Sequence, residues 1–200
     1  MQDVYIVDVE LLHVTRTKRF IKELCIYNVP TMQLQNYLVL PSARWCSLKP
    51  DIQSLNSYIT ANIHKIEYNH GQIDQESAIE FLINTTKGLS LILAKGHDKC
   101  QFIATLTGKS VFNLETFGCP KVSDLPATND CSCLTHPPNF LHCCQIKCLR
   151  FGRWFYPVLE QLVNKTYHTN WIYLAKYMVH PKYIDDYLKN AKNNGKKQVL

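Results

Sequence analysis

The sequence predicts an α/β fold built around a mixed sheet. Three β-rich runs follow one another near the N-terminus, and helical and strand-like segments alternate after them. Hydrophobic residues make up 46% of the 200 residues and charged residues 19%, so the chain can bury a core. No apolar run reaches the roughly 18–20 residues of a membrane span, and the acidic N-terminus is unlike a secretory leader. We therefore expect an intracellular protein with no membrane partner.

Three strands are expected in the first forty residues. They cover residues 5–11, 19–27 and 33–40, and Pro41 ends the third. Each run is rich in β-branched and aromatic residues, which is typical of strands. Short connections between the runs favour an antiparallel meander.

The middle of the chain is expected to alternate helix and strand. Residues 50–68 and 75–86 have helical apolar spacing. The short apolar run 89–94 is typical of a buried parallel strand. A helix is then expected over residues 99–106, and a fifth strand over 110–114.

The last third begins with a long loop. Residues 118–142 contain four prolines, and a segment of this length needs something to hold it in place. A helical pattern returns over 140–155, and 171–179 and 183–191 are two further candidate helices. Residues 190–200, rich in Lys and Asn, are expected to form a frayed end.

The order of elements is therefore β-β-β-α-β-α-β-α with extra helices after it. This order matches the ribonuclease-H-like fold, a mixed sheet with helices on both faces. We expect residues 1–156 to form this domain, with a metal-binding loop at 118–144. Residues 157–200 are expected to form a C-terminal helical extension with a basic tail.

Asp8 and Glu10 form the most informative short motif. They stand one residue apart on the first expected strand, so both side chains project from the same face. Two carboxylates placed in this way can share one divalent cation, which takes oxygen ligands. The spacing Asp-x-Glu is also common on solvated strands, so later segments decide its meaning.

Two later segments, taken with this pair, resemble the DEDDh group of 3′–5′ exonucleases. Residues 91–103 resemble the family's second motif, in which a strand leads into a helix that carries an acid. Residues 142–149 resemble the third motif and put His142 at the general-base position. The resemblance covers about residues 4–155. It implies a ribonuclease-H-like fold and metal-dependent cleavage of a phosphodiester at a 3′ end.

Lysine occupies two of the family's acid positions. Lys99 aligns with the third acid, with Asp98 one residue away, and Lys147 aligns with the fourth. Ammonium groups at these positions remove two ligands and repel Mg²⁺. We therefore expect the two lysines to pair with Asp8 and Glu10 and to close the site without metal.

The expected function is that of a catalytically impaired exonuclease-like domain, which acts as a nucleic-acid-binding or protein-interaction module. The alternative is an active metal-dependent 3′–5′ exonuclease, which needs Mg or Mn and a register in which Asp98 is a ligand. Its catalytic residues would be Asp8, Glu10, Asp98 and His142. A second alternative is a pure protein-binding adaptor.

Six of the nine cysteines gather between residues 119 and 148. The odd number, without a secretion signal, argues against a disulfide framework. Cys25, Cys46 and Cys100 stand alone in apolar stretches and are expected to be small core residues.

The cysteine cluster predicts a structural zinc ion. Cys133 and His136 lie three residues apart, and Cys119 and Cys143 can complete a tetrahedral Cys₃His set. Scattered reduced thiols without metal are the alternative. Three residues compete for the ligand positions: Cys131, Cys144 and His142.

Two further resemblances bear on this site. The Maelstrom domain is similar, since it is a ribonuclease-H-like fold that lost its acids and carries a Cys/His zinc site. Uncharacterised proteins from arthropod repetitive or viral elements are similar around residues 8–10, 20–24, 95–99, 113–120 and 133–136. The second resemblance implies no activity.

Positive charge is concentrated at the C-terminus. Lys and Arg exceed Asp and Glu by six over the whole chain. Between residues 176 and 200 there are six Lys and two Asp, a local excess of four. A basic arm on nucleic acid is the functional interpretation and a solvated tail the alternative. The expected partner is nucleic acid bound through this segment, or a protein.

Overall fold

Five strands form one mixed sheet in the order β3-β2-β1-β4-β5. The structure is a computed structural model that describes residues 3–128, 136 and 140–165. β2 alone runs opposite to the other four strands. This arrangement confirms the predicted α/β class and is consistent with a ribonuclease-H-like fold. The strands are β1 (Val4–His13), β2 (Arg19–Asn28), β3 (Leu34–Leu38), β4 (Leu91–Ala94) and β5 (Val111–Asn113).

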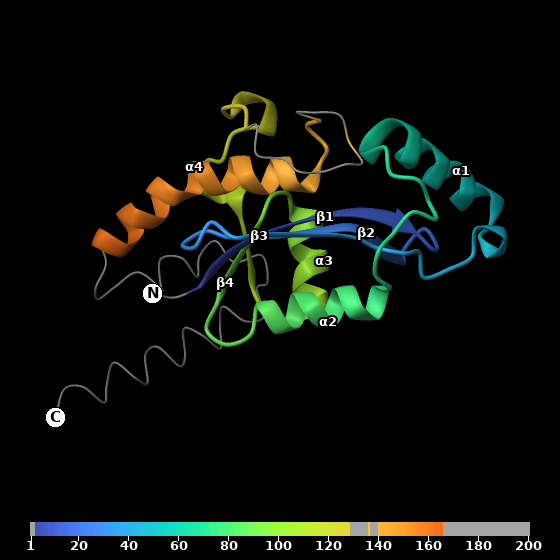
Figure 1. Cartoon of the computed structure of the whole chain (residues 1–200), viewed down its shortest axis with the longest axis horizontal. Coiled ribbons are helices and arrows are strands. Elements are labelled where there is room, and N and C mark those ends of the chain that lie inside the picture. The colour runs from blue at the N-terminus through green and yellow to red at the C-terminus, as the bar shows by residue number, and fades with distance from the viewer. Residues whose placement is uncertain (1–2, 129–135, 137–139, 166–200) are drawn as a thin grey trace.

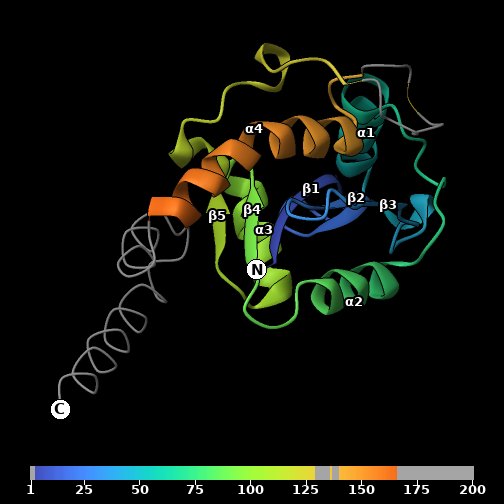
Figure 2. The same cartoon turned by 60° about the vertical axis from the view of Figure 1, so that its left-hand side comes forward.

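Helices cover both faces of the sheet (Figure 1). α4 lies across one face, and α2 and α3 lie on the other. Figure 2 agrees with Figure 1 that α1 is on the side of α4, beyond the start of that helix. The helices are α1 (Pro50–Ile59), α2 (Gln75–Thr85), α3 (His97–Thr107) and α4 (Cys144–Lys165). No described helix is long and apolar enough to cross a membrane.

The central strands divide the core into two layers because their side chains alternate. Ile6 on β1 and Tyr27 on β2 face α4 and pack with Phe151 and Phe155. The residues that alternate with them along the strands, such as Val7 and Ile26, face α2 and α3 in a second cluster. β1 is covered on both faces and flanked on both edges, so any polar side chain at its centre is removed from water.

Two predicted helices have different bounds in the structure. The helix expected over 50–68 ends as α-helix at Ile59 and continues for one π-helical stretch, Thr60–His64. Lys65 follows in the left-handed region, with φ of 60°, which ends the helix. α4 begins at Cys144, because the residues just before it form a turn rather than the expected first helical turn.

The predicted domain boundary at 156/157 falls inside α4. This helix continues through Pro157, which removes one backbone donor without ending it. Beyond the proline, Val158 and Leu159 still pack against the core on the α4 side of the sheet. The helices expected at 171–179 and 183–191 lie outside the described residues.

Candidate functional site

The acidic pair lies at the centre of the sheet, on the face covered by α4. Asp8 and Glu10 are on β1, between β2 and β4, and are 2% and 7% exposed. They alternate with Val7 and Val9, which enter the core on the opposite face. Partners are needed here, because a buried charge without one is strongly unfavourable.

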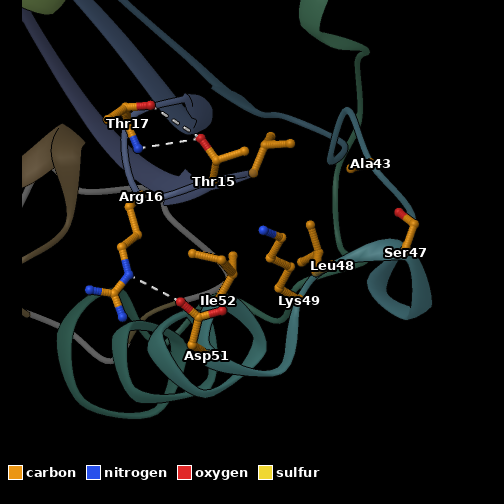
Figure 3. A pocket seen from close by; sticks show the side chains of 10 residues that line it. Thr15, Arg16, Thr17, Ala43, Ser47, Leu48, Lys49, Asp51 and Ile52 are labelled. Carbon is orange, nitrogen blue, oxygen red and sulfur yellow. Dashed lines mark hydrogen bonds and ion pairs between the residues drawn. The ribbon is translucent and has the colours of Figure 1, made fainter.

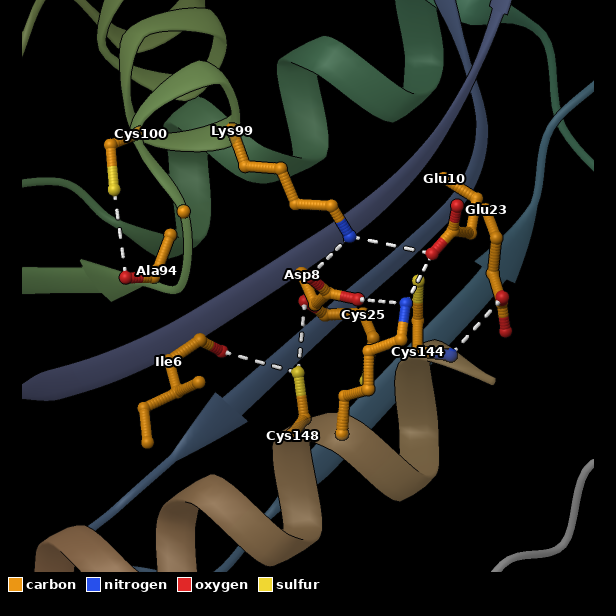
Figure 4. A network of polar contacts seen from close by, with 12 residues as sticks. Ile6, Asp8, Glu10, Glu23, Cys25, Ala94, Lys99, Cys100, Cys144 and Cys148 are labelled. Atoms are coloured by element: carbon orange, nitrogen blue, oxygen red, sulfur yellow. Dashed lines mark hydrogen bonds and ion pairs between the residues drawn. The ribbon is translucent and has the colours of Figure 1, made fainter. Parts of the chain in front are cut away.

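Two lysines from different helices contact both acids, and Figure 4 shows Lys99 pointing toward Asp8 and Glu10. Lys99, in the first turn of α3, places its Nζ 2.7 Å from Asp8 Oδ1 and 3.3 Å from Glu10 Oε1. Lys147, at the start of α4, places its Nζ 3.2 Å from Asp8 Oδ2 and also pairs with Glu10 Oε1. The sequence predicted these pairings, and the structure contains them. We call these four residues the acid–lysine cluster.

Ion pairing in the acid–lysine cluster shifts the pKa values of Asp8 and both lysines in the direction that favours their charged forms. Burial raises the pKa of Asp8, but attraction to Lys147 and Lys99 outweighs burial, so this pKa lies below its ordinary value. Burial lowers the pKa of Lys147, but attraction to Asp8 and Glu10 raises it well above its usual range. The pKa of Lys99 is also raised, by the same two acids against burial. The Asp8 carboxylate and the two ammonium groups therefore stay ionised, and with Glu10 the formal charges of the cluster sum to zero.

This cluster is a poor fit for the divalent metals of a nuclease. The ligand-type atoms gathered here are one oxygen each from Asp8 and Glu10 and the sulfur of Cys144. Mg²⁺ and Mn²⁺ prefer oxygen, and a thiol is a soft ligand. Burial and the neighbouring acids, Glu23 first among them, raise the pKa of Cys144 well above its usual value, so its sulfur stays protonated. Asp8 Oδ1 and Glu10 Oε1 already accept hydrogen bonds from lysine.

The other residues of the catalytic hypothesis lie outside this cluster. Asp98 is exposed, whereas its neighbour Lys99 turns toward the acids. His142 is exposed in the turn before α4, and its ring centroid lies 5.6 Å from that of Phe140. The alternative set Asp8, Glu10, Asp98 and His142 is therefore not brought together as metal ligands within the described residues.

A second group of metal-ligand atoms lies close by. One ligand atom each from Glu23, His136 and Cys143 lie within 4.8 Å of one another, and all three residues are buried. The three come from β2, from the long loop and from the residue preceding α4. We call them the Glu23 cluster. An oxygen, a nitrogen and a sulfur together match the ligand types that zinc takes in proteins.

Hydrogen bonds hold two members of the Glu23 cluster. His136 donates from Nε2 to the backbone carbonyl of His64 over 2.5 Å, since the carbonyl can only accept. In the neutral ring, a proton on Nε2 puts the lone pair on Nδ1, which is the arrangement of a metal-bound histidine that donates to a carbonyl from its other nitrogen. Glu23 Oε2 accepts the backbone N–H of Cys144 over 3.3 Å. The residues of this site therefore fit a zinc ion.

The ligand set predicted for zinc is only partly brought together. His136 and Cys143 are adjacent, but Cys119 belongs to the core cluster on the α4 side of the sheet and is not grouped with them. Burial raises the pKa of Cys119 to about 11, so its sulfur remains a thiol among apolar neighbours. Cys133 lies outside the described residues, as does its rival Cys131.

The remaining cysteines divide between core and surface. Cys25 and Cys100 are buried, as predicted, whereas Cys46 is exposed in a short 3₁₀ turn. This three-residue turn has no buried residue, so the apolar neighbours that suggested burial do not enclose Cys46.

Sequence reasoning missed Glu23. This residue lies in the middle of β2, a strand with eight successive buried residues, and its Cα pairs directly with that of Glu10. Two carboxylates at opposed positions repel each other unless cations separate them. An acid in the middle of an apolar run was the available signal. The distance in sequence from Glu23 to His136 hid their proximity.

Comparisons with known proteins give structural neighbours only. No protein-family model matches the sequence, and no curated protein is similar to it. In structure the chain is similar to the nuclease domain of 3′hExo, a DEDDh family member, bound to rAMP. The identity is 13%, with 80% of this chain and 92% of that chain covered and a TM-score of 0.46. A full-length 3′-exonuclease is similar at 14% identity, with 80% and 82% covered and a TM-score of 0.45.

Proposed function

We propose that this chain is a catalytically impaired exonuclease-like domain that works as a nucleic-acid-binding module. One observation carries the proposal: both acids at the centre of β1 are ion-paired with Lys99 and Lys147. Cleavage by two metal ions needs several anionic oxygens around cations about 3.5–4 Å apart. Here the ammonium groups occupy the space next to the carboxylates and neutralise them.

The proposed structural role of metal is separate from this cluster. A zinc ion held by the Glu23 cluster, with Cys133 as fourth ligand, would fix the long loop against the start of α4. Support comes from the burial of the three described ligands and from the hydrogen bond that orients His136. A closed set of four protein ligands is typical of structural zinc.

The experiment that tests the proposal is a nuclease assay on the full chain. Purified protein is incubated with 3′-labelled single-stranded DNA or RNA in the presence of Mg²⁺ or Mn²⁺. We expect no shortening of the strand, while the same protein binds the strand at low salt. Metal-dependent shortening that disappears in Asp8→Ala and Glu10→Ala would instead establish the active 3′–5′ exonuclease.

Binding of single-stranded nucleic acid distinguishes the nucleic-acid-binding module from the pure protein-binding adaptor. The proposed nucleic-acid contact of the C-terminal segment predicts that deletion of residues 192–200 weakens binding and flattens its dependence on salt. A full-length protein that binds no single strand at low salt would leave the pure protein-binding adaptor as the explanation.

A further inference from the structure

A pocket of about 480 Å³ lies beyond the end of β1, away from the acid–lysine cluster. Three segments line it: the turn between β1 and β2, the segment around the 3₁₀ turn Trp45–Ser47, and the start of α1. Figure 3 shows Arg16 on one wall and Lys49 projecting between the walls. Its volume falls within the range of sites that bind small organic ligands.

Positive charge surrounds the pocket. Four exposed cations lie on its lining segments or next to them, against one acid, Asp51. The pocket therefore has a local excess of three positive charges, all on exposed side chains. The acid–lysine cluster, in contrast, cancels its own charge in the interior. The four cations are Arg16, Lys18, Arg44 and Lys49.

Asp51 holds one of these cations in position. Arg16 donates from Nε to Asp51 Oδ2 over 3.1 Å. Within the described chain this is the one ion pair of that guanidinium, and it uses the Nε edge. The terminal nitrogens are left as a fork, the geometry in which arginine binds phosphate.

The rest of the pocket combines apolar side chains with the hydroxyl residues Thr15, Thr17 and Ser47. Val14, Ala43, Leu48 and Ile52 contribute to its lining, and Leu48 and Ile52 belong to the small core between α1 and the ends of β1 and β2. A lining of this kind can cover a base or a sugar, while the cations at the rim contact phosphate. Proteins that bind single-stranded nucleic acid combine cations along the phosphate backbone with side chains, most often aromatic, that cover the bases. In this pocket aliphatic and hydroxyl side chains take the place of the aromatic ones.

From these features we propose that the pocket binds one nucleotide unit of a single-stranded nucleic acid. The base or sugar lies on the apolar lining, and the phosphate pairs with Arg16 and Lys49. This inference rests on the proposed function and deepens it, since it locates a nucleic-acid contact outside the acid–lysine cluster and in the described part of the chain.

The test measures binding of a short labelled oligouridylate to full-length protein across a salt series. The test variant is Arg16→Glu with Lys49→Glu. Its matched control is Lys87→Glu with Lys121→Glu, which makes the same charge change at two exposed lysines away from the pocket. Loss of two phosphate contacts should make the negative slope of log K against log salt shallower by about 1.4, with roughly tenfold weaker binding or more at low salt. The control should bind like wild type.

A second variant guards against damage to the fold. Arg44→Glu with Lys49→Glu leaves the Arg16–Asp51 pair intact and should also weaken binding, with an unchanged melting temperature. Suppose that both pocket variants bind oligouridylate as tightly as the control, and that deletion of residues 192–200 abolishes this binding. That result would overturn the pocket as a nucleotide site and leave the proposed function standing. No binding by wild type would overturn both. A pocket that binds an acidic peptide but not oligouridylate would belong to a protein partner, and this result would also overturn the inference.

Discussion

Lys147 Nζ lies 3.2 Å from Asp8 Oδ2 and joins the start of α4 to the central strand of the sheet. The two residues are 139 positions apart, and both are buried. An ion pair in this position gains attraction from its low-dielectric surroundings but also loses hydration, so its net effect on stability is small. Removal of one partner is different, because it leaves the other charge buried.

Asp8→Ala should therefore destabilise the domain by roughly 3–5 kcal/mol, the usual cost of breaking a buried pair. The free energy of unfolding from urea titration at neutral pH measures the effect. Asp98→Ala is the matched control, since Asp98 is exposed one residue before Lys99 and should change stability by less than about 0.5 kcal/mol. Equal effects of the two variants would mean that the acid–lysine cluster does not form in solution.

The same cluster predicts a pH dependence with a defined sign. The pKa of Asp8 in the folded protein lies below its ordinary value of 3.8, so the unfolded chain takes up a proton first as the pH falls. The stability from Asp8 is therefore complete above about pH 4 and is lost on acidification below it. Lys147, whose pKa is raised above 10.5, contributes stability below that pH and loses it at higher pH.

The variant Asp8→Asn isolates the acid side of this dependence. The difference in unfolding free energy between wild type and Asp8→Asn should be largest near neutral pH and should shrink as the pH falls below about 4. Urea titrations of both proteins at a series of pH values give this difference. A difference that stays constant down to pH values near 3 would show that Asp8 has no lowered pKa.

Zinc content gives the third prediction. Protein purified without chelator should carry about one zinc per chain, and His136→Ala or Cys143→Ser should remove it and destabilise the domain. The effect should be smaller than the roughly 10 kcal/mol of small zinc domains, because a sheet is already present here. Cys119→Ser serves as the control, since this cysteine lies in the apolar core and should keep the metal. Elemental analysis that finds no zinc in wild type would contradict the site.

The sequence predicts best the features that are determined by neighbouring residues, and least well those that depend on contacts between residues far apart in the chain. The strands follow local patterns, so β1 and β2 lie where the β-branched and aromatic residues indicated. The Asp8–Glu10 spacing is also local. The contact of these acids with Lys99 and Lys147 became predictable only through the family resemblance, which aligned the lysines with acid positions.

Features that depend on side-chain proximity across the fold were harder to predict. Cys119 and Cys143 both fall in the cysteine-rich segment, but only Cys143 reaches His136, because Cys119 packs under α4 with apolar residues. Glu23 contacts that group from β2, more than a hundred residues earlier in the chain. Spacing within one segment cannot reveal a ligand supplied by a distant strand.

Gly152 gives a prediction about packing. A Cβ at this position of α4 would overlap Cε1 of Tyr27, whose ring is buried on β2 and cannot move aside. In an exposed helix, Gly→Ala stabilises by about 1 kcal/mol. Here we expect Gly152→Ala to destabilise the domain by about 1–3 kcal/mol, because overpacking outweighs helix propensity. Thermal unfolding measures the change, with Glu160→Ala on an exposed position of the same helix as control. A stabilised Gly152→Ala would mean that α4 packs less closely on β2.

The last prediction concerns the space that the two lysines fill. The double variant Lys99→Asp with Lys147→Asp replaces the four ion pairs of the cluster with four carboxylates. Their mutual repulsion should destabilise the metal-free protein, and the carboxylate oxygens should now attract a hard divalent cation. Wild type should show no change of melting temperature with Mn²⁺, whereas the double variant should be stabilised as Mn²⁺ is added. The single variant Lys99→Met is the control: it removes one cation without adding an oxygen, so it should lose stability and gain no response to Mn²⁺. A wild-type protein stabilised by Mn²⁺ to the same extent as the double variant would mean that the lysines do not exclude metal, and the active exonuclease would then replace the impaired one.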